Sequence, residues 1–500
     1  MMRPTEFAAQ IAANHIIGNR DFTKKIGYFP TPSEGGRLLF KEVGLDFSSM
    51  ADLGAGGGML TAAAIEAAAR SKFAKEIHCT LYENQIQIIP LLRKVMKYTQ
   101  TWAKKMGIKF RYSIRCVDLM DVFLNEDFEY TLVVSNPPFV RVPAGSDLKE
   151  QAKKFMCKTN LYGAFMEGAL KWTSQKGHLL LITPTSWKNG LYFSKLRENF
   201  LPKVRLERIV SFKHRHNVFK NVLQDIEFTI WCKGKRLTTK SKVKITLAEK
   251  LSKVEPYNEF ELLHEALIPN RDRGEILTPD HPEQLALIQS VSDKLTQTLD
   301  DLKVEVLIGQ VVMFRESDGV VNSKLRREVD LQLIREHHIR PTGLLNQVEG
   351  KELEQWIRQD SPNIKSRKNI VLVSRRGAKN DRRRLVTSFV TEHHGGIENK
   401  VMYLERTGRA APTLMKGISA FMNSSFADIQ IRCICGGTMI NKGDLLRLRL
   451  PKRKNLLTLG KMLESHTEAK ELDRLIASLF RLEDCVFDCW EGHFSPWKSQ

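Results

Sequence analysis

Short apolar runs alternate with helical patterns along the first half of the chain. A turn of three glycines, residues 56–58, separates the apolar run Met50–Leu53 from the stretch LTAAAIEAAAR, which predicts a helix over residues 60–70. Further runs that predict strands are Ile77–Tyr82, Ile114–Val117, Tyr130–Val134 and His178–Ile182. Strands that alternate with helices in this way favour an α/β fold, in which a mostly parallel sheet is covered by helices.

Polar side chains stand where several of these strands end. Glu83, Asp118 and Asn136 close the second, third and fourth runs, and Thr183 follows the fifth. In an open parallel sheet a ligand binds beyond the carboxyl ends of the strands. We therefore expect these side chains to converge on one crevice.

The character of the sequence changes after about residue 235. Residues 233–261 are rich in lysine, and residues 269–282 are rich in turn formers and charged residues. We expect a first domain over residues 1–240, a linker over residues 241–270 and a second domain over residues 271–500, which mixes strand and helix signals as an α+β domain does. The first 20 residues predict an amphipathic helix that caps the first domain.

The charge balance favours a polyanionic partner. The chain has 78 Lys and Arg against 57 Asp and Glu, a net charge of +21. Residues 1–250 hold 40 basic and 22 acidic side chains, and the remainder holds 38 and 35, so most of the excess lies in the first half. A well-solvated surface without such a partner is the plainer interpretation of these charges.

Composition also bears on location and on metals. No apolar stretch approaches the roughly 20 residues that a membrane-spanning helix needs, so we expect no membrane role and a cytoplasmic protein. The eight cysteines have no disulfide-scaffold spacing. Cys433, Cys435, Cys485, Cys489 and His493 are the candidates for a zinc site, but their spacing differs from the usual pairs and we expect no metal.

The segment Asp52–Gly58, DLGAGGG, lies between a predicted strand and a predicted helix. Glycines there let a ligand approach the backbone, but the loop lacks the lysine of a phosphate-binding loop and the spacing of dinucleotide enzymes. A carboxylate at the second strand end, Glu83, can hold two ribose hydroxyls, and one at the third, Asp118, can accept from an adenine amino group. This set suits S-adenosylmethionine; a helix-start turn with two capping acids is the other interpretation.

The segment SNPPFV, residues 135–140, offers chemistry for an amino group of a nucleobase. Such an amine is a poor nucleophile because its lone pair is delocalised into the ring. The side-chain oxygen of Asn136 and the carbonyl of Pro137, which proline geometry holds in one direction, can each accept one amino hydrogen. Phe139 offers a flat face on which the base can stack.

Six motifs together resemble the gamma-class N6-adenine DNA methyltransferases of restriction-modification systems. The resemblance covers about residues 22–235. The motifs are Gly27–Pro32, Asp52–Gly58, Asn136–Phe139, Asn160–Phe165, Gly177–Trp187 and Phe219–Val222.

The resemblance implies a Rossmann-like S-adenosylmethionine-dependent domain with a mostly parallel seven-stranded sheet. It places cofactor contacts at Phe29, Pro30, Thr31, Asp52, Gly54, Ala55, Gly56, Glu83, Asp118, Leu119 and Asn136. Leu119 stands where many members have an aromatic residue, so its contact with the cofactor adenine is only apolar. Asn136, Pro137 and Phe139 would act on the target adenine, and Phe219 would pack against that base after it rotates out of the duplex. A core phenylalanine is the other interpretation of Phe219.

The second domain looks like a target-recognition domain, which implies double-stranded DNA as the partner. Arginine forks suit guanine edges and phosphates, so the candidate contacts are Arg375, Arg376, Arg382, Arg383 and Arg384. We expect a monomer that modifies a short duplex site and protects it from a separate restriction endonuclease.

Other activities remain open at this stage. An RNA base methyltransferase, acting on adenine N6 or guanine N2, or a protein-glutamine methyltransferase can share the Asn-Pro-Pro strand end. An enzyme with its own nuclease and a DNA-binding protein with an inactive methyltransferase fold are further alternatives. The chain contains no Pro-Cys dipeptide of the kind that marks cytosine-C5 methylation, where a thiolate attacks the ring.

Overall fold

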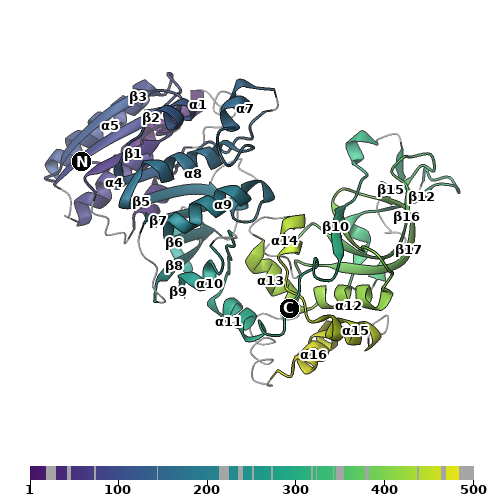
Figure 1. Cartoon of the computed structure of the whole chain (residues 1–500). Helices are drawn as coiled ribbons and strands as arrows, with labels where there is room; N and C mark the ends of the chain where they lie inside the picture. The colour runs from purple at the N-terminus through teal and green to yellow at the C-terminus, as the bar shows by residue number, and fades with distance from the viewer. Residues whose placement is uncertain are drawn as a thin grey trace. The chain divides into compact units, whose positions relative to one another are not determined.

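The computed structural model divides into two compact units, Met1–Ile276 and Leu277–Gln500 (Figure 1), and each is described by itself. The residues described are 1–18, 30–41, 47–71, 75–143, 145–212, 225–234, 240–250, 253–271, 274–316, 319–322, 324–341, 343–344, 354–377, 381, 383–435, 439–462 and 469–482. Within these residues, no helix is both long and apolar enough to cross a membrane.

A nine-stranded sheet forms the centre of the first unit, in the order β3-β2-β1-β4-β5-β7-β6-β8-β9. The strands are β1 (Ser49–Leu53), β2 (Glu76–Glu83), β3 (Lys109–Cys116), β4 (Tyr130–Ser135), β5 (Thr173–Pro184), β6 (Val204–Phe212), β7 (Ile226–Lys233), β8 (Lys242–Lys250) and β9 (Lys253–Leu263). The first five pair in parallel, whereas β7 runs antiparallel to both β5 and β6. The strand order reverses between β1 and β4, the kind of point where open α/β sheets bind ligands.

Helices connect and cover these strands. They are α1 (Pro4–Gly18), α3 (Ser33–Leu39), α4 (Met59–Ser71), α5 (Ile89–Lys105), α6 (Leu119–Asn125), α7 (Asp147–Ala152), α8 (Leu161–Trp172), α9 (Ser194–Phe200) and α10 (His264–Leu267), with short 3-10 turns at η1 (Thr185–Lys188), η2 (Leu191–Phe193) and η3 (Leu201–Lys203). The predicted N-terminal helix is confirmed as α1, and the Thr5 hydroxyl donates to Glu66 of α4 at 2.8 Å.

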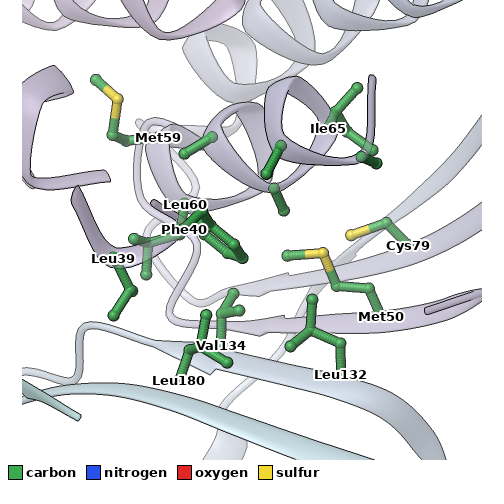
Figure 2. Close-up of a cluster of buried hydrophobic side chains, with 14 of the residues drawn as sticks. Leu39, Phe40, Met50, Met59, Leu60, Ile65, Cys79, Leu132, Val134 and Leu180 are labelled. Atoms are coloured by element: carbon green, nitrogen blue, oxygen red, sulfur yellow. The ribbon is translucent and has the colours of Figure 1, made fainter. Parts of the chain in front are cut away.

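The main core lies between α4 and the parallel strands. Figure 2 shows Phe40 and Leu60 above the strands, where Leu132, Val134 and Leu180 point toward them. Val133, which faces the opposite side of β4, is also fully buried. Burial on both faces explains why the central strands are nearly continuous apolar runs in the sequence.

Residues 241–270 are not a linker, which corrects the expectation from composition. They form β8, β9 and α10 at one edge of the sheet of the first unit. On β8, Val243 and Ile245 are buried, whereas Lys242 and Lys244 pair with Glu261 and Glu259 across the strand pair, at 3.0 and 3.2 Å. The lysines are thus the solvent-facing half of an alternating strand pattern.

The second unit is α+β. Its seven-stranded sheet has the order β10-β18-β16-β17-β12-β15-β11 and is antiparallel except for the pairing of β12 with β17. The strands are β10 (Val304–Ile308), β11 (Val320–Asn322), β12 (Leu331–Ile334), β15 (Glu354–Ile357), β16 (Lys365–Ser374), β17 (Thr387–Ile397) and β18 (Val401–Arg406), beside a two-stranded sheet of β13 (Ile339–Arg340) and β14 (Gly343–Leu344). The helices are α11 (Pro282–Ser290), α12 (Pro412–Met422), α13 (Ser425–Ile434), α14 (Lys442–Leu446), α15 (Arg453–Met462) and α16 (Ala469–Phe480), and the 3-10 turns are η5 (Met313–Arg315) and η6 (Glu336–His338).

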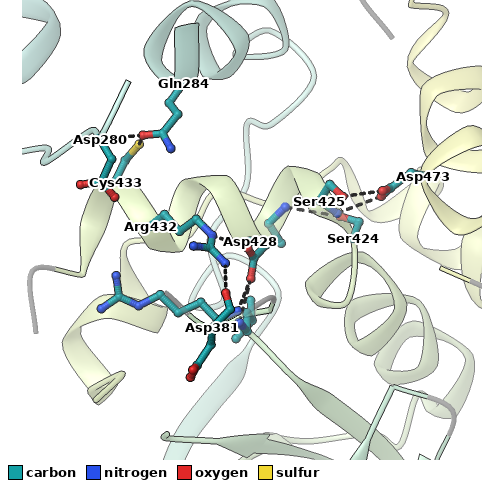
Figure 3. Close-up of polar contacts among 12 residues, drawn as sticks. Asp280, Gln284, Asp381, Ser424, Ser425, Asp428, Arg432, Cys433 and Asp473 are labelled. Atoms are coloured by element: carbon teal, nitrogen blue, oxygen red, sulfur yellow. Dashed lines mark hydrogen bonds and ion pairs between the residues drawn. The ribbon is translucent and has the colours of Figure 1, made fainter. Parts of the chain in front are cut away.

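Two buried carboxylates tie α13 to its surroundings (Figure 3). Asp428 accepts the backbone N–H groups of Arg384 and Leu385 at 2.7 and 2.9 Å, and it also accepts from Arg432 Nε at 2.6 Å. Asp473 of α16 accepts from both the N–H and the hydroxyl of Ser425 at the start of α13. Each carboxylate therefore has several donors that offset its burial.

Candidate active site

A cavity of about 560 Å³ opens at the carboxyl ends of the parallel strands. It has the size usual for a small-molecule site. Its lining includes the predicted site residues Pro30, Thr31, Asp52, Gly54, Ala55, Gly56, Glu83, Asp118, Leu119, Asn136 and Pro137. The structure thus brings together residues that are up to 107 positions apart in the chain, Pro30 to Pro137.

The glycine turn after β1 has a backbone that other residues rarely adopt. Gly54, Gly56 and Gly58 have φ values of +74°, +52° and +78°. The N–H groups of Gly54 and Ala55 donate to the carbonyl of Tyr82 at 3.0 and 2.9 Å, which anchors the turn to the end of β2. The turn therefore forms a fixed wall of backbone against the cavity.

Asp52 stabilises the base of this turn. It is buried, and its Oδ2 accepts a hydrogen bond from the Thr61 hydroxyl of α4 at 2.7 Å. Burial raises the pKa of Asp52 to about 7. The Asp52 carboxyl therefore gains or loses its proton near neutral pH.

Glu83 joins the glycine turn to the segment after β2. Its Oε2 accepts the N–H of Gly56 at 2.8 Å, and its Oε1 accepts the N–H of Gln85 at 2.9 Å. Burial raises the pKa of the Glu83 carboxyl, and these N–H donors oppose that shift. A carboxylate oxygen has two acceptor sites, so each oxygen can also accept from a ligand hydroxyl.

Asp118 and Leu119 form the next part of the wall. Asp118 caps α6, and its Oδ1 accepts the N–H of Met120 at 2.9 Å. Leu119 follows as a buried apolar side chain. The cap orients the Asp118 carboxylate, and Leu119 gives the cavity an apolar surface beside it.

Asn136 follows β4 and is held by a residue from the N-terminal segment. Its Nδ2 donates to Oγ1 of Thr31 at 3.0 Å. Just before it, the Ser135 hydroxyl donates to the carbonyl of Leu53 at 2.8 Å, which joins the ends of β4 and β1. Pro137 is buried and lines the cavity.

Phe139 lies outside the cavity lining and belongs to an aromatic group beyond β4. Its ring meets Tyr162 of α8 edge to face at 6.5 Å, and Tyr162 stacks with Phe193 at 5.1 Å. The Tyr162 hydroxyl also lies 3.0 Å from that of Ser186. Phe29 and Phe219, predicted to contact the cofactor and the target base, lie outside the described residues.

Several residues of the cavity were not predicted from the sequence. They are Ala8 and Ala12 of α1, Asp147 and Gln151 of α7, and Phe165 of α8. Of these five, only Phe165 lies in a motif that the sequence analysis identified, Asn160–Phe165. Helix-face residues such as Ala8 become part of a site only when the sheet and helix come together, which local patterns do not specify.

The predicted arginine contacts of the second unit have different environments. Arg376 is 79% exposed and pairs with Glu336 at 3.4 Å. Arg375 donates to the carbonyls of Asn399 and Ile440, and burial lowers its pKa.

The other three predicted contacts are the neighbouring arginines Arg382, Arg383 and Arg384. Arg384 is fully buried, with Nη2 3.0 Å from the Cys435 sulfur, so its guanidinium faces the interior and cannot reach a phosphate in this structure. Arg383 is half-buried, and Arg382 lies outside the described residues.

Only two of the five candidate zinc ligands, Cys433 and Cys435, belong to the described residues. Cys433 and Cys435 are buried in the second unit, where their sulfurs lie 3.8 Å from Gln284 Oε1 and 3.4 Å from the Met439 carbonyl. Cys485, Cys489 and His493 lie outside the described residues.

The strand order of the first unit is that of the Rossmann-like fold of S-adenosylmethionine-dependent methyltransferases. The glycine turn and the strand-end acids lie where that fold binds its ligand. More particularly, residues 2–219, somewhat less than half of the chain, match the Eco57I restriction-modification methylase family. S-adenosylmethionine is accordingly the cofactor. Residues 2–219 thus resemble the DNA methyltransferases of restriction-modification systems.

Similarity to known methyltransferases extends over nearly the whole chain. The Type II methyltransferase M.PstI of Providencia stuartii is 27% identical over 496 residues, which cover 94% of this chain and 96% of the relative. The Type II methyltransferase M.BsuBI of Bacillus subtilis is 24% identical, covering 92% and 94%. Among solved structures, the ATP-dependent Type ISP restriction-modification enzyme LlaBIII bound to DNA matches with a TM-score of 0.50 and 10% identity, covering 86% of this chain and 38% of that one. The last likeness concerns the fold alone.

Proposed function

We propose that the protein transfers a methyl group from S-adenosylmethionine to N6 of adenine in a short duplex DNA sequence. The observation that carries the proposal is the position of Asn136 and Pro137 at the end of β4, on the wall of the cavity that Glu83 and Asp118 also line. Asn136 and Pro137, the proposed amine acceptors, thus share one cavity with the acids proposed to bind the nucleoside.

The cofactor would be held by the residues whose chemistry fits its parts. Glu83 would accept from the ribose hydroxyls and Asp118 from the adenine amino group, with Leu119 against the ring. The glycine turn would lie along the methionine part, and Pro30 and Thr31 would cover it. When bound, S-adenosylmethionine supplies an electrophilic methyl group.

Asn136 and Pro137 would act on the target amine. The side-chain oxygen of Asn136 and the carbonyl of Pro137 each accept one amino hydrogen, which draws the nitrogen toward tetrahedral geometry and makes its lone pair available for attack. Because Asn136 Nδ2 donates to Thr31, the amide turns its acceptor oxygen away from Thr31. The proton that the amine loses after attack passes to solvent, and orientation supplies most of the acceleration.

The target adenine would reach this site by rotating out of the duplex. Extrusion costs a few kcal/mol, which stacking and hydrogen bonds in the pocket offset. Phe139, supported edge to face by Tyr162, would provide the stacking surface. Phe219 would pack on the same base.

The second unit would choose the DNA site. Its exposed arginine Arg376 is a candidate for a phosphate or base contact, and the net charge of +21 favours DNA binding. We propose that the protein acts as a monomer and that its methylation protects DNA from a separate restriction endonuclease. A monomer is sufficient because the two strands of a site can be modified in turn.

Labelled nucleosides test the activity directly. Purified protein is incubated with tritiated S-adenosylmethionine and either duplex DNA or RNA, and the nucleic acid is digested to nucleosides. The expected product is labelled N6-methyldeoxyadenosine from DNA. Label in RNA alone, or in a methylated cytosine, would overturn the proposal.

A further inference from the structure

Three side chains with metal-binding atoms meet on three neighbouring strands of the first unit. They are His178 of β5, Cys232 of β7 and Glu207 of β6, and one ligand atom from each lies within 4.8 Å of the others. We propose that they bind a divalent transition-metal ion of the zinc type. This site is separate from the proposed methyl-transfer chemistry and does not depend on it.

The sheet register explains why these residues meet. His178 pairs directly with Cys232 between β5 and β7, and Cys232 pairs with Arg205 between β7 and β6. Cross-strand partners lie on the same face of a sheet, so these three side chains form one row. The β6–β7 register shifts between Leu206 and Arg208, and the extra residue of this bulge is Glu207.

Glu207 lies two residues after Arg205, so the alternation of β6 places its side chain on the same face as the row. The bulge adds one residue to β6 at this point and bends the strand. Glu207 Oε2 lies 3.2 Å from His178 Nε2. Bulges are common next to functional sites.

The two oxygens of Glu207 have different neighbours. Oε2 faces His178, whereas Oε1 is held by the guanidinium of Arg205. A metal-ligating carboxylate is usually oriented in this way by a second hydrogen bond. Arg205 would therefore fix Glu207 without occupying the oxygen that faces the site.

The separations suit a tetrahedral ion. With bonds of about 2.0–2.3 Å to nitrogen, oxygen and sulfur, the ligand atoms of a zinc site lie roughly 3.5 Å apart. The His178–Glu207 distance of 3.2 Å is close to this value, and the Cys232 sulfur lies within 4.8 Å of both other ligand atoms.

The mixed ligand set indicates which ion would bind. Thiolate, imidazole and carboxylate together favour zinc over magnesium or calcium, which prefer oxygen alone. On binding, the Cys232 thiol gives up its proton to solvent and its sulfur bonds to the ion. His178 and Glu207 remain 21% and 23% exposed, so a water molecule can complete the coordination.

The site would fasten the antiparallel part of the sheet. His178 pairs with Leu132, four residues before Asn136, which places the ion roughly 13 Å along the strands from the proposed reaction site. Leu180 and Ile230 belong to the apolar core on the same face. The ion would thus link β5, β6 and β7 beside that core.

Cobalt substitution tests the proposal with the full chain. The purified protein is stripped with a chelator and titrated with Co²⁺. We expect a thiolate-to-cobalt charge-transfer band in the near ultraviolet, its loss in Cys232→Ser, and at least about tenfold weaker binding in Glu207→Gln. The matched control is Cys116→Ser, which removes an exposed thiol of β3 and should keep the band.

A second readout guards against loss of folding in the variants. Zinc should raise the Tm of the wild-type protein and of Cys116→Ser but not that of Cys232→Ser, whose circular dichroism should match the wild type. The proposal is overturned if the wild type shows no charge-transfer band, or if the band and the zinc-dependent Tm shift survive in Cys232→Ser. Because neither readout uses methyl transfer, failure here leaves the proposed activity unaffected.

Discussion

The amide of Asn136 donates a hydrogen bond to the hydroxyl of Thr31 at 3.0 Å, across 105 positions of sequence. This contact links the Thr-Pro segment before α3 to the Asn-Pro-Pro segment after β4. It engages the donor end of the amide and thereby determines which way the acceptor end points. A side chain that must accept a hydrogen from an amine would otherwise be able to turn its NH₂ group toward that amine.

Removing the Thr31 hydroxyl should therefore slow methyl transfer. In Thr31→Val the amide loses the partner that orients it, at a cost of about 1 kcal/mol, so kcat should fall roughly five- to tenfold. Thr31→Ser keeps the hydroxyl and should retain most of the rate. Steady-state kinetics with duplex DNA measure both variants, and equal rates for the two would refute an orienting role for the hydroxyl.

Glu83→Gln should weaken cofactor binding. The substitution replaces one carboxylate oxygen by an NH₂ group, which faces the backbone N–H donors of Gly56 or Gln85 and reduces the acceptors left for the ribose. Hydrogen bonds to charged groups contribute about 1.5–3 kcal/mol, so the Kd should rise at least about tenfold. Calorimetric titration with S-adenosylmethionine measures it. Glu76→Gln, an exposed change on the same strand, is the control and should bind as the wild type does.

Asp52 should make stability depend on pH. Burial raises its pKa from 3.8 to about 7 in the folded protein, so the folded state holds a proton that the unfolded state releases. The stabilisation of the folded state by this proton is fully present below about pH 4 and is lost as pH rises through about 7. Between about pH 5 and 8, the Tm of Asp52→Asn should fall less with rising pH than that of the wild type. Parallel curves would show that Asp52 does not titrate in this range.

Arg376→Ala should weaken DNA binding without affecting the cofactor. An exposed arginine that contacts a phosphate contributes about one unit to the salt dependence of binding, so the slope of log Kd against log salt should drop by about one. Fluorescence anisotropy over a salt series measures the slope. Arg111→Ala removes an exposed charge from β3 of the first unit, and identical behaviour of the two variants would exclude a specific contact at Arg376.

The parallel half of the sheet and most of the cavity were predictable from the sequence. Runs such as Tyr130–Val134 are buried on both faces, so their apolar character is visible without an alignment, and polar residues at their ends mark the ligand side. The edge strands were not predictable from composition, because Lys242 and Lys244 occupy the exposed half of β8 and resemble a charged linker.

Features created by tertiary contacts were also missed. Asp147 of α7 and Ala8 of α1 reach the cavity only through the packing of their helices, and no local pattern identifies them. Arg384 belongs to a basic cluster in the sequence, but its position beside Asp428 and Cys435 turns it inward. The grouping of His178, Glu207 and Cys232 likewise depends on strand register, which spacing along the chain does not specify.

The central claim is that Asn136 accepts a hydrogen from the target amine, and single-turnover methyl transfer by Asn136→Ala tests it most directly. The variant should bind S-adenosylmethionine and DNA within a few-fold of the wild type while the rate falls about 100- to 1,000-fold. Asn125→Ala, the same change at an exposed residue that ends α6, should leave the rate unchanged. A rate for Asn136→Ala within tenfold of the wild type, with binding intact, would contradict the account.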